Sequence, residues 1–345
     1  MRSIQVRSPG EVAVVEVPIP RPGPGEALLR VLYAGICGSD LQTFRGTQPF
    51  ATYPRVPGHE FSARIVEIAG DPGGFSIGDV VTGVPYFQDG TCPACRRGLI
   101  NACEHNETMG VHRDGAFQEF LTMPVDRLHA ADGVDPQDLA LVEPFSIGHH
   151  ATRRAEVGPG DRVLVLGAGA IGLLTMLSAL SRGATVSIAD IVERRLALAR
   201  GLGAQATFDL SATTIPEAVS AATDGDGFDV VCEATGLPVS FHNAIEAARV
   251  GGRMVLIGNG TREVTFNQSA LIKKELDVFG SRNSRDVFAP LIEMLQRGEV
   301  DVSPIRTRTV PLAGAAAALE AAAAGATDEV KVLIEFSSPT AAPLP

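Results

Sequence analysis

The sequence is short of basic residues. It has 29 lysine and arginine residues against 40 aspartate and glutamate residues, a formal net charge of −11. Nucleic acids and anionic membrane surfaces attract proteins that carry a basic patch, so the charge balance argues against both partners. The sequence also lacks an apolar run long enough to span a bilayer. Its longest mainly apolar stretch, residues 315–324, is predicted to be a short alanine-rich helix.

Cysteine is scarce, with five residues in 345. The N-terminus shows no signal peptide, because residues 1–6 alternate polar and apolar side chains as a strand does. Few cysteines without a secretory signal favour metal binding or reduced thiols over a disulfide framework. We therefore expect a cytoplasmic protein. Cys232, in an apolar run, is expected to be a core residue.

The pattern of the chain changes near residue 160, and at roughly 150 residues per domain the length also indicates two domains. Before that point glycine and proline separate short apolar runs, which predicts an all-β unit. After it, apolar strands alternate with helical patterns, which predicts a parallel sheet wound on both faces. The overall class is therefore α/β. The last segment, residues 337–345, is rich in Pro, Ala and Ser and is expected to be disordered.

The motif GAGAIG at residues 167–172 follows an apolar strand and opens a helix, which is the context of a dinucleotide-binding turn. Its glycines allow a tight turn, a close approach of pyrophosphate, and close packing of helix on strand. The first N–H groups of the helix can then bind phosphate. An ordinary turn between strand and helix is the alternative.

An acidic residue, Asp190, ends the next strand. It can accept hydrogen bonds from both hydroxyls of an adenosine ribose and would repel a 2′-phosphate, which favours NAD. Arg194 and Arg195 follow and could hold such a phosphate, so NADP is the alternative. The predicted cofactor-binding residues are Gly167, Gly169, Ile171, Gly172, Asp190 and Arg195.

Three residues of the first half, Cys37, His59 and Glu143, are of the types that bind zinc. Three protein ligands leave a fourth position open, which distinguishes a catalytic zinc from a structural one. Taken singly, each has a simpler explanation. Cys37 could be a small buried hydrophobe, His59 a turn residue, and Glu143 an exposed acid before a proline.

Together these residues belong to the segments Cys37–Asp40, Gly58–Glu60 and Val142–Pro144. With the glycine-rich turn, the segments resemble the zinc-dependent medium-chain dehydrogenases in order and spacing, from the first strand to Phe336. Glutamate at the third ligand position resembles the sorbitol and threonine dehydrogenase branch, since liver-type alcohol dehydrogenases have cysteine there.

The resemblance implies a GroES-like β domain plus a Rossmann domain with a doubly wound parallel sheet. The GroES-like domain would comprise residues 1–148, completed by residues 284–345, and would carry both zinc sites. The Rossmann domain would comprise residues 149–283. Catalysis is expected in the cleft between the two domains. A homo-oligomer, either a tetramer or a dimer, is also expected, because members of the family commonly form one.

The resemblance also implies catalytic roles. Zinc held by Cys37, His59 and Glu143 would bind the substrate oxygen as a Lewis acid. Glu60, beside a ligand, would enter or leave the coordination sphere as substrate and water exchange. Asp40 would accept a hydrogen bond from the other ring nitrogen of His59 and fix its tautomer.

Ser39 is expected to pass the alcohol proton outward. Many relatives have a histidine three residues further on, but this sequence has Gln42, which cannot titrate. The proton would therefore leave through water, the ribose hydroxyls or another group.

A second zinc site is expected at Cys92, Cys95 and Cys103. The family's structural zinc has four cysteines, and its first position is Asp89 here. A carboxylate can bind zinc, so these four residues would form a closed tetrahedral site that stabilises a surface lobe. His105 is an alternative fourth ligand, and the site could also be empty.

The substrate is indicated by residues 109–117, 142–145 and 275–283, which resemble the bacterial hexonate 5-dehydrogenases that act on L-gulonate or L-galactonate. A substrate carboxylate could pair with Arg282 or Arg113, although either could be a surface arginine. Lys331, on the last strand, is expected near the cofactor phosphates.

The predicted function is hydride transfer from a secondary alcohol of a polyol or sugar acid to NAD. One alternative is a zinc dehydrogenase with another substrate, such as threonine or a simple alcohol. A zinc-free quinone or enone reductase would lack the ligand trio. A non-catalytic nucleotide-binding protein of the same fold would have no use for an open metal site.

Overall fold

The computed structural model describes residues 1–325 and 329–336. The chain divides into two compact units, one made of residues 1–143 and 288–345 and the other of residues 144–287. The sequence predicts domain boundaries after residues 148 and 283, and these exact boundaries remain a prediction. Residues 337–345, for which the sequence predicts disorder, lie outside the described residues.

The first unit is mainly β-structure. Its largest sheet has the order β16-β17-β3-β4-β5-β9, with β8 also paired to β3. The strands of this unit are β1 (Arg2–Ser8), β2 (Glu11–Glu16), β3 (Glu26–Gly35), β4 (Glu60–Ala69), β5 (Val80–Gly83), β6 (Tyr86–Phe87), β7 (Glu107–Thr108), β8 (Phe120–Pro124), β9 (Leu128–Ala130), β16 (Arg306–Pro311) and β17 (Lys331–Glu335). The helices are α1 (Gly38–Arg45), α2 (Pro93–Arg96), α3 (Pro136–Leu139), α10 (Phe288–Gln296) and α11 (Ala315–Ala323), with 3-10 turns at Ile100–Ala102, Val125–Arg127, Ser303–Ile305 and Leu312–Gly314.

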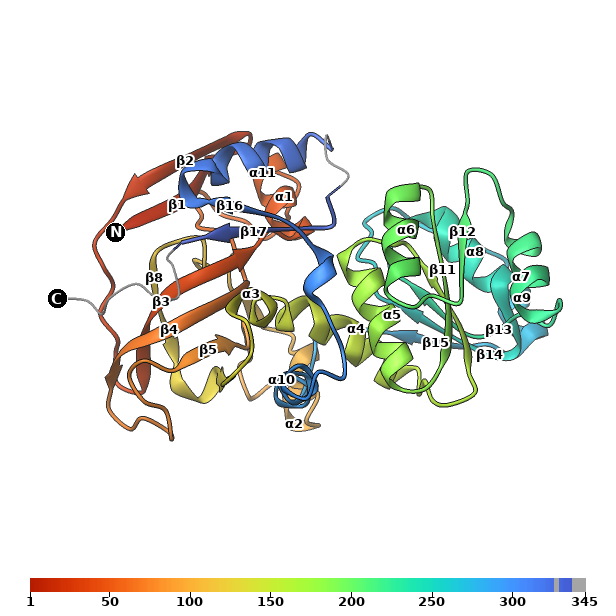
Figure 1. The fold of residues 1–345 in the computed structure, drawn as a ribbon, viewed down its shortest axis with the longest axis horizontal. Coiled ribbons are helices and arrows are strands. Elements are labelled where there is room, and N and C mark those ends of the chain that lie inside the picture. Colours follow the sequence, from red (N-terminus) through yellow and green to blue (C-terminus); the bar gives the residue numbers. More distant parts are fainter. Residues whose placement is uncertain (326–328, 337–345) are drawn as a thin grey trace. The chain divides into compact units, whose positions relative to one another are not determined.

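The strand β3 lies at the centre of this unit, and eight of its ten residues are buried. It pairs antiparallel with β4, β8 and the C-terminal strand β17. Figure 1 shows β17 beside β3, so the end of the chain is part of the same sheet as its beginning. This pairing brings residues 331–335 close to the loops that follow β3.

The second unit has a six-stranded parallel sheet in the order β12-β11-β10-β13-β14-β15. Its strands are β10 (Arg162–Leu166), β11 (Thr185–Asp190), β12 (Ala206–Asp209), β13 (Phe228–Glu233), β14 (Ala248–Leu256) and β15 (Asp277–Gly280). The helices are α4 (Val142–Arg154), which begins in the first unit, α5 (Ala170–Ser181), α6 (Glu193–Gly201), α7 (Ile215–Thr223), α8 (Pro238–Ala247) and α9 (Ser269–Lys274).

The strand β10 explains why this sheet forms. Four of its five residues are buried, as expected for a strand that is covered on both faces. Leu164 and Leu166 pack with residues of α7 and α8, whereas Val165 faces Gly172 of α5. Figure 1 shows these helices packed along the strands of this unit. The predicted doubly wound parallel sheet is confirmed.

Within the described residues, none of the helices combines the length and the apolar character that a passage through a bilayer requires.

Candidate metal and nucleotide sites

Three residues of the first unit converge on one point. Cys37 is the residue just before α1, while His59 and Glu60 stand at the start of β4. The Cys37 sulfur, a ring nitrogen of His59 and a carboxylate oxygen of Glu60 all lie within 4.8 Å of one another. A thiolate, an imidazole and a carboxylate form a donor set that suits zinc. His59 Nδ1 is also buried without a hydrogen-bond partner.

The predicted hydrogen bond from His59 to Asp40 is not formed, because Nδ1 and Oδ1 are 4.0 Å apart. The Asp40 carboxylate instead accepts the backbone N–H of Cys37 at 2.8 Å and that of Gly58 at 3.0 Å. Asp40 is fully buried, and the amides that it binds belong to one candidate ligand and to the residue before the other. It therefore fixes the backbone at both ligands, and this competes with a bond to the imidazole.

The charges in this cluster influence one another. Burial alone would lower the pKa of His59, but the Cys37 thiol, Glu143 and Asp40 outweigh it and raise this pKa well above its usual value. Burial raises the pKa of Glu143, and Glu60 adds to that increase. Several acidic side chains are therefore buried close together, and a bound cation would compensate their negative charges.

Glu143 lies on the first turn of α4 and is buried. Its carboxylate is not part of the group of mutually close ligand atoms found among the described residues, although its charge acts on both His59 and Glu60. One oxygen of Glu143 accepts a hydrogen bond from the hydroxyl of Tyr86, a buried residue on β6. No sequence motif singles out Tyr86, since its partner is 57 residues away.

Lys331 has a contact that the sequence did not predict. Its ammonium group lies 2.7 Å from both carboxylate oxygens of Glu60, while its expected place near the cofactor phosphates stays a prediction. The two side chains are buried, with exposed fractions of 4% and 0%. Lys331 therefore belongs to the surroundings of the metal cluster.

The groups proposed for proton transfer are placed as follows. The Ser39 hydroxyl, two residues beyond Cys37, is buried and has no hydrogen-bond partner. Gln42, on the next turn of α1, accepts a hydrogen bond from the Gln48 side chain at 3.3 Å. A free hydroxyl at Ser39 is compatible with a group that receives a proton from substrate, and Gln42 is engaged elsewhere.

The four residues that the resemblance implies for a second site lie together in the structure. Ligand atoms of Asp89, Cys92, Cys95 and Cys103 all lie within 4.8 Å of one another. The sulfur atoms of Cys92 and Cys103 are 3.9 Å apart, near the ~3.8 Å that two 2.3 Å zinc–sulfur bonds at a tetrahedral angle would give. The alternative ligand, His105, is exposed, and its Nε2 lies 3.8 Å from Asp89 Oδ2.

The pKa shifts in this second cluster also indicate that a bound cation would stabilise it. The backbone N–H groups of Cys92 and Thr91 hold the pKa of Asp89 well below its usual value. Burial and the neighbouring thiols raise the pKa of Cys95 to about 12. Without a cation, the three thiols cannot all ionise beside a charged carboxylate, because like charges disfavour one another. The four residues together have the composition of a closed zinc site.

The glycine-rich turn of the second unit has the shape that its sequence requires. Gly167 has a φ of 98°, which a residue with a side chain rarely adopts. A Cβ atom at Gly172 would overlap the carbonyl oxygen of Gly167, so only glycine lets α5 begin this close to β10. Gly169 precedes the first residue of α5, and the N-terminus of that helix is therefore free to bind an anion.

Asp190 ends β11 and contacts the same turn. Its Oδ2 accepts the backbone N–H of Ala168 at 2.6 Å, and its Oδ1 accepts those of Ile191 and Val192. The carboxylate is thus held beside the turn where an adenosine ribose would lie. Arg195, on α6, has an Nε without a hydrogen-bond partner.

The two arginines suggested for a substrate carboxylate lie on different units. The guanidinium of Arg113 packs 4.0 Å from the centre of the Phe87 ring and is 3.9 Å from Glu107. Arg282 is exposed. The contacts of Arg113 are those of a surface arginine, the alternative that the sequence left open.

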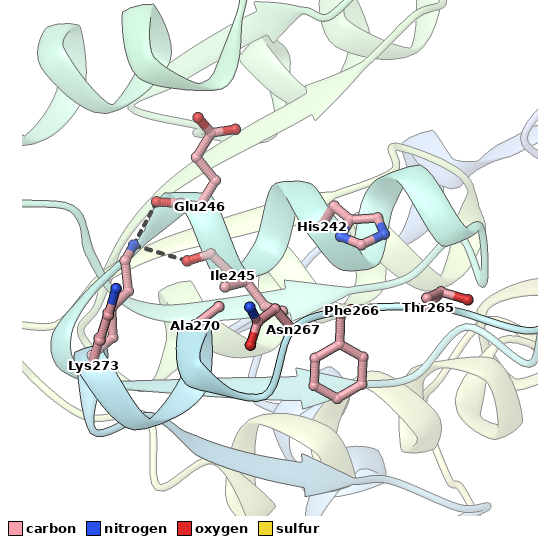
Figure 2. A pocket seen from close by; sticks show the side chains of 9 residues that line it. His242, Ile245, Glu246, Thr265, Phe266, Asn267, Ala270 and Lys273 are labelled. Carbon is pink, nitrogen blue, oxygen red and sulfur yellow. Dashed lines mark hydrogen bonds between the residues drawn. The ribbon is translucent and has the colours of Figure 1, made fainter.

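A cavity of about 470 Å³ lies within the second unit, and none of the predicted cofactor-binding residues lines it. Lys274, at its edge, donates to the carbonyl oxygens of Ile245, Glu246 and Ala248. Figure 2 shows two of these bonds, which end on the backbone oxygens of Ile245 and Glu246. Because they satisfy carbonyl groups at the end of α8, Lys274 has a structural role.

Comparison with known proteins identifies the family. A model for the GroES-like domain of alcohol dehydrogenases matches residues 23–133, and one for zinc-binding dehydrogenases matches residues 170–297. The L-galactonate-5-dehydrogenase of Escherichia coli K12 is 36% identical over 97% of this chain and 99% of its own length. The chain belongs to the zinc-binding dehydrogenase family. The predicted family, the GroES-like and Rossmann fold, and the dehydrogenase class are confirmed.

Solved structures of similar dehydrogenase fold contain both forms of the cofactor. A Sinorhizobium meliloti 1021 protein bound to NADP has a TM-score of 0.91 and 31% identity, covering 97% of this chain and 98% of its own. An Escherichia coli CFT073 alcohol dehydrogenase complexed with NADH has a TM-score of 0.90 and 30% identity, covering 97% and 99%. The dehydrogenase described here is thus similar to proteins that bind either cofactor.

Proposed function

We propose that this dehydrogenase oxidises a secondary alcohol of a sugar acid or polyol, using zinc and NAD. The observation that supports this proposal is the convergence of Cys37, His59 and Glu60, with Glu143 in electrostatic contact. A non-catalytic nucleotide-binding protein would not need such a buried set of metal ligands. The similarity to an L-galactonate dehydrogenase favours a substrate with several hydroxyl groups and a carboxylate.

The residues of the chain would divide the chemistry among them. Cys37, His59 and Glu143 would hold the zinc, which supplies Lewis acidity toward an alcohol oxygen. Asp40 keeps the backbone of the first two ligands in place through its two amide hydrogen bonds. Ser39, whose hydroxyl has no other partner, would relay the proton released by the alcohol, accepting it as its own proton moves on to water or a ribose hydroxyl. The glycine-rich turn and Asp190 would bind the pyrophosphate and ribose of NAD.

We propose that the second cluster, Asp89 with three cysteines, binds a structural zinc. Support comes from the mutual approach of its four ligand atoms and from the sulfur spacing. A homo-oligomer is also proposed, because β15 forms an edge of the sheet in the described chain and the nearby Val278 and Ile272 are 40% and 72% exposed. Light scattering would measure its size. We retain the cytoplasm as the proposed location.

The proposed function is tested by a panel of aldonates, polyols, threonine and simple alcohols. Protein of measured zinc content is mixed with each compound and NAD, and NADH absorbance is followed. We expect the largest kcat/KM for an aldonate or polyol, because the family similarity favours that class. Turnover of only simple alcohols or threonine would overturn the substrate class, and a folded, zinc-loaded protein without any turnover would support a non-catalytic role.

The choice of NAD over NADP should depend on the charge of Asp190. Asp190→Asn retains an oxygen for the N–H of Ala168 but loses the charge that would repel a 2′-phosphate. We expect kcat/KM for NADP to rise roughly tenfold or more relative to that for NAD, since like charges brought together cost at least ~1.4 kcal/mol, a factor of ten. Kinetics with both cofactors at saturating substrate measure this ratio.

A matched control is Asp209→Asn. Asp209 ends β12 directly beside Asp190 in the sheet, and its carboxylate caps a turn at Ser211. This variant should leave the cofactor ratio unchanged. If Asp190→Asn also leaves it unchanged, the ribose is recognised by other residues.

A further inference from the structure

The ammonium group of Lys331 is saturated by two partners. It lies 2.7 Å from each carboxylate oxygen of Glu60 and 3.1 Å from the carbonyl oxygen of Ile36, the residue before Cys37. An ammonium group has three N–H donors, and these contacts use all of them. Lys331 is the only lysine or arginine among the buried residues of the described chain.

Three neighbouring strands create this contact. Lys331 begins β17, Glu60 begins β4, and β3 lies between them. In the sheet, Gly35 of β3 pairs with both Glu60 and Leu333. A Cβ atom at Gly35 would overlap the carboxylate of Glu60. Glycine at this position therefore lets the Glu60 side chain pass over β3 to reach Lys331.

Glu60 consequently lies between two sites that attract its charge. One oxygen lies within 4.8 Å of the ligand atoms of Cys37 and His59, whereas both oxygens contact the Lys331 ammonium. The charge of Lys331 also acts on Glu143, whose carboxylate accepts a hydrogen bond from the Tyr86 hydroxyl. Of the two glutamates, Glu60 is the one whose carboxylate oxygens both lie 2.7 Å from the Lys331 ammonium group.

We propose that Lys331 is a positioning residue that holds the Glu60 carboxylate away from the catalytic zinc, so that one coordination position stays open for substrate. This inference rests on the proposed function. A carboxylate that loses a buried cationic partner must find another cation, and the zinc is adjacent. Without Lys331, Glu60 would become a fourth protein ligand and close the site, as in structural zinc centres.

The test compares Lys331→Met with the charge-conserving Lys331→Arg. Zinc affinity is measured by competition with a chromophoric chelator, and a Cys37→Ser protein reports binding at the second cluster alone. Residues around a metal site alter its affinity on the scale of about 10- to 100-fold. We expect Lys331→Met to hold the catalytic zinc more tightly than the wild type by a factor of that size, because Glu60 would add a fourth ligand. Lys331→Arg should resemble the wild type.

A second readout reports the open position directly. Cobalt-substituted protein is titrated with imidazole, whose binding at an open position changes the visible absorption spectrum of cobalt. The wild type should respond, and Lys331→Met should not. The double variant Lys331→Met/Glu60→Gln should respond again and should have the zinc affinity of Glu60→Gln alone, because Lys331 acts through the Glu60 charge.

A Lys331→Met protein that responds to imidazole like the wild type, or that binds zinc more weakly with no recovery in the double variant, would overturn the inference. If Lys331→Met does not fold, Lys331→Gln provides the same comparison with a polar side chain. Failure of the wild type to bind zinc at Cys37 would instead refute the proposed function. The two failures are therefore distinguishable.

Discussion

Glu143→Ala should reduce kcat at least about a thousandfold while binding of NADH stays nearly the same. The buried carboxylate of Glu143 acts on His59 and Glu60, and its loss would remove a proposed zinc ligand. The metal contributes several kcal/mol to catalysis of this kind, and each ~1.4 kcal/mol is a factor of ten in rate. The glycine-rich turn belongs to the other unit, so cofactor affinity should be unaffected.

The measurements are NADH formation under saturating substrate, zinc content per chain, and NADH binding by fluorescence. Glu143→Gln is the matched variant, since its amide oxygen can still accept the Tyr86 hydrogen bond and bind zinc weakly. We expect it to lose less activity than Glu143→Ala. If Glu143→Ala keeps both its zinc and its turnover, Glu143 is not part of the metal site.

The sequence was sufficient where a function depends on neighbours in the chain. The glycine-rich turn is an example, because the backbone angles of Gly167 and the close packing at Gly172 are both local consequences of glycine. The spacing of Asp89, Cys92 and Cys95 is equally local, and the structure brings Cys103 to the same point. Such motifs specify geometry within a few residues.

The sequence was insufficient where a side chain binds a partner from a distant strand. Lys331 and Glu60 are 271 residues apart, and a lysine at the start of a strand is usually exposed. Only the pairing of β17 with β3, and the absence of a side chain at Gly35, determine that contact. Asp40 was misjudged for a related reason, because its carboxylate binds backbone amides that any sequence contains.

Cys103→Ser should release one zinc ion and loosen the lobe formed by residues 89–105. The buried residues of this lobe's small core are Cys92, Cys95 and Cys103 themselves, so little apolar packing remains when the metal is lost. Metal binding is often the main source of stability in such small zinc modules. Arg96 and Arg97 are exposed in this lobe, and trypsin should cleave after them at least about tenfold faster in the variant, because cleavage follows the population of opened lobe.

Zinc content should fall from about two ions per chain to about one, since a closed site that loses a ligand binds the metal weakly. Some turnover should persist, because the proposed catalytic ligands Cys37, His59 and Glu143 are unchanged. Glu104→Gln alters an exposed side chain of the same lobe and should leave both zinc content and cleavage at wild-type values. Wild-type protein treated with a chelator should reproduce the fast cleavage. Cleavage that stays slow in Cys103→Ser, with both zinc ions retained, would show that hydrogen bonds such as those from Thr91 and Cys92 to Asp89 are enough to hold the lobe without this ligand.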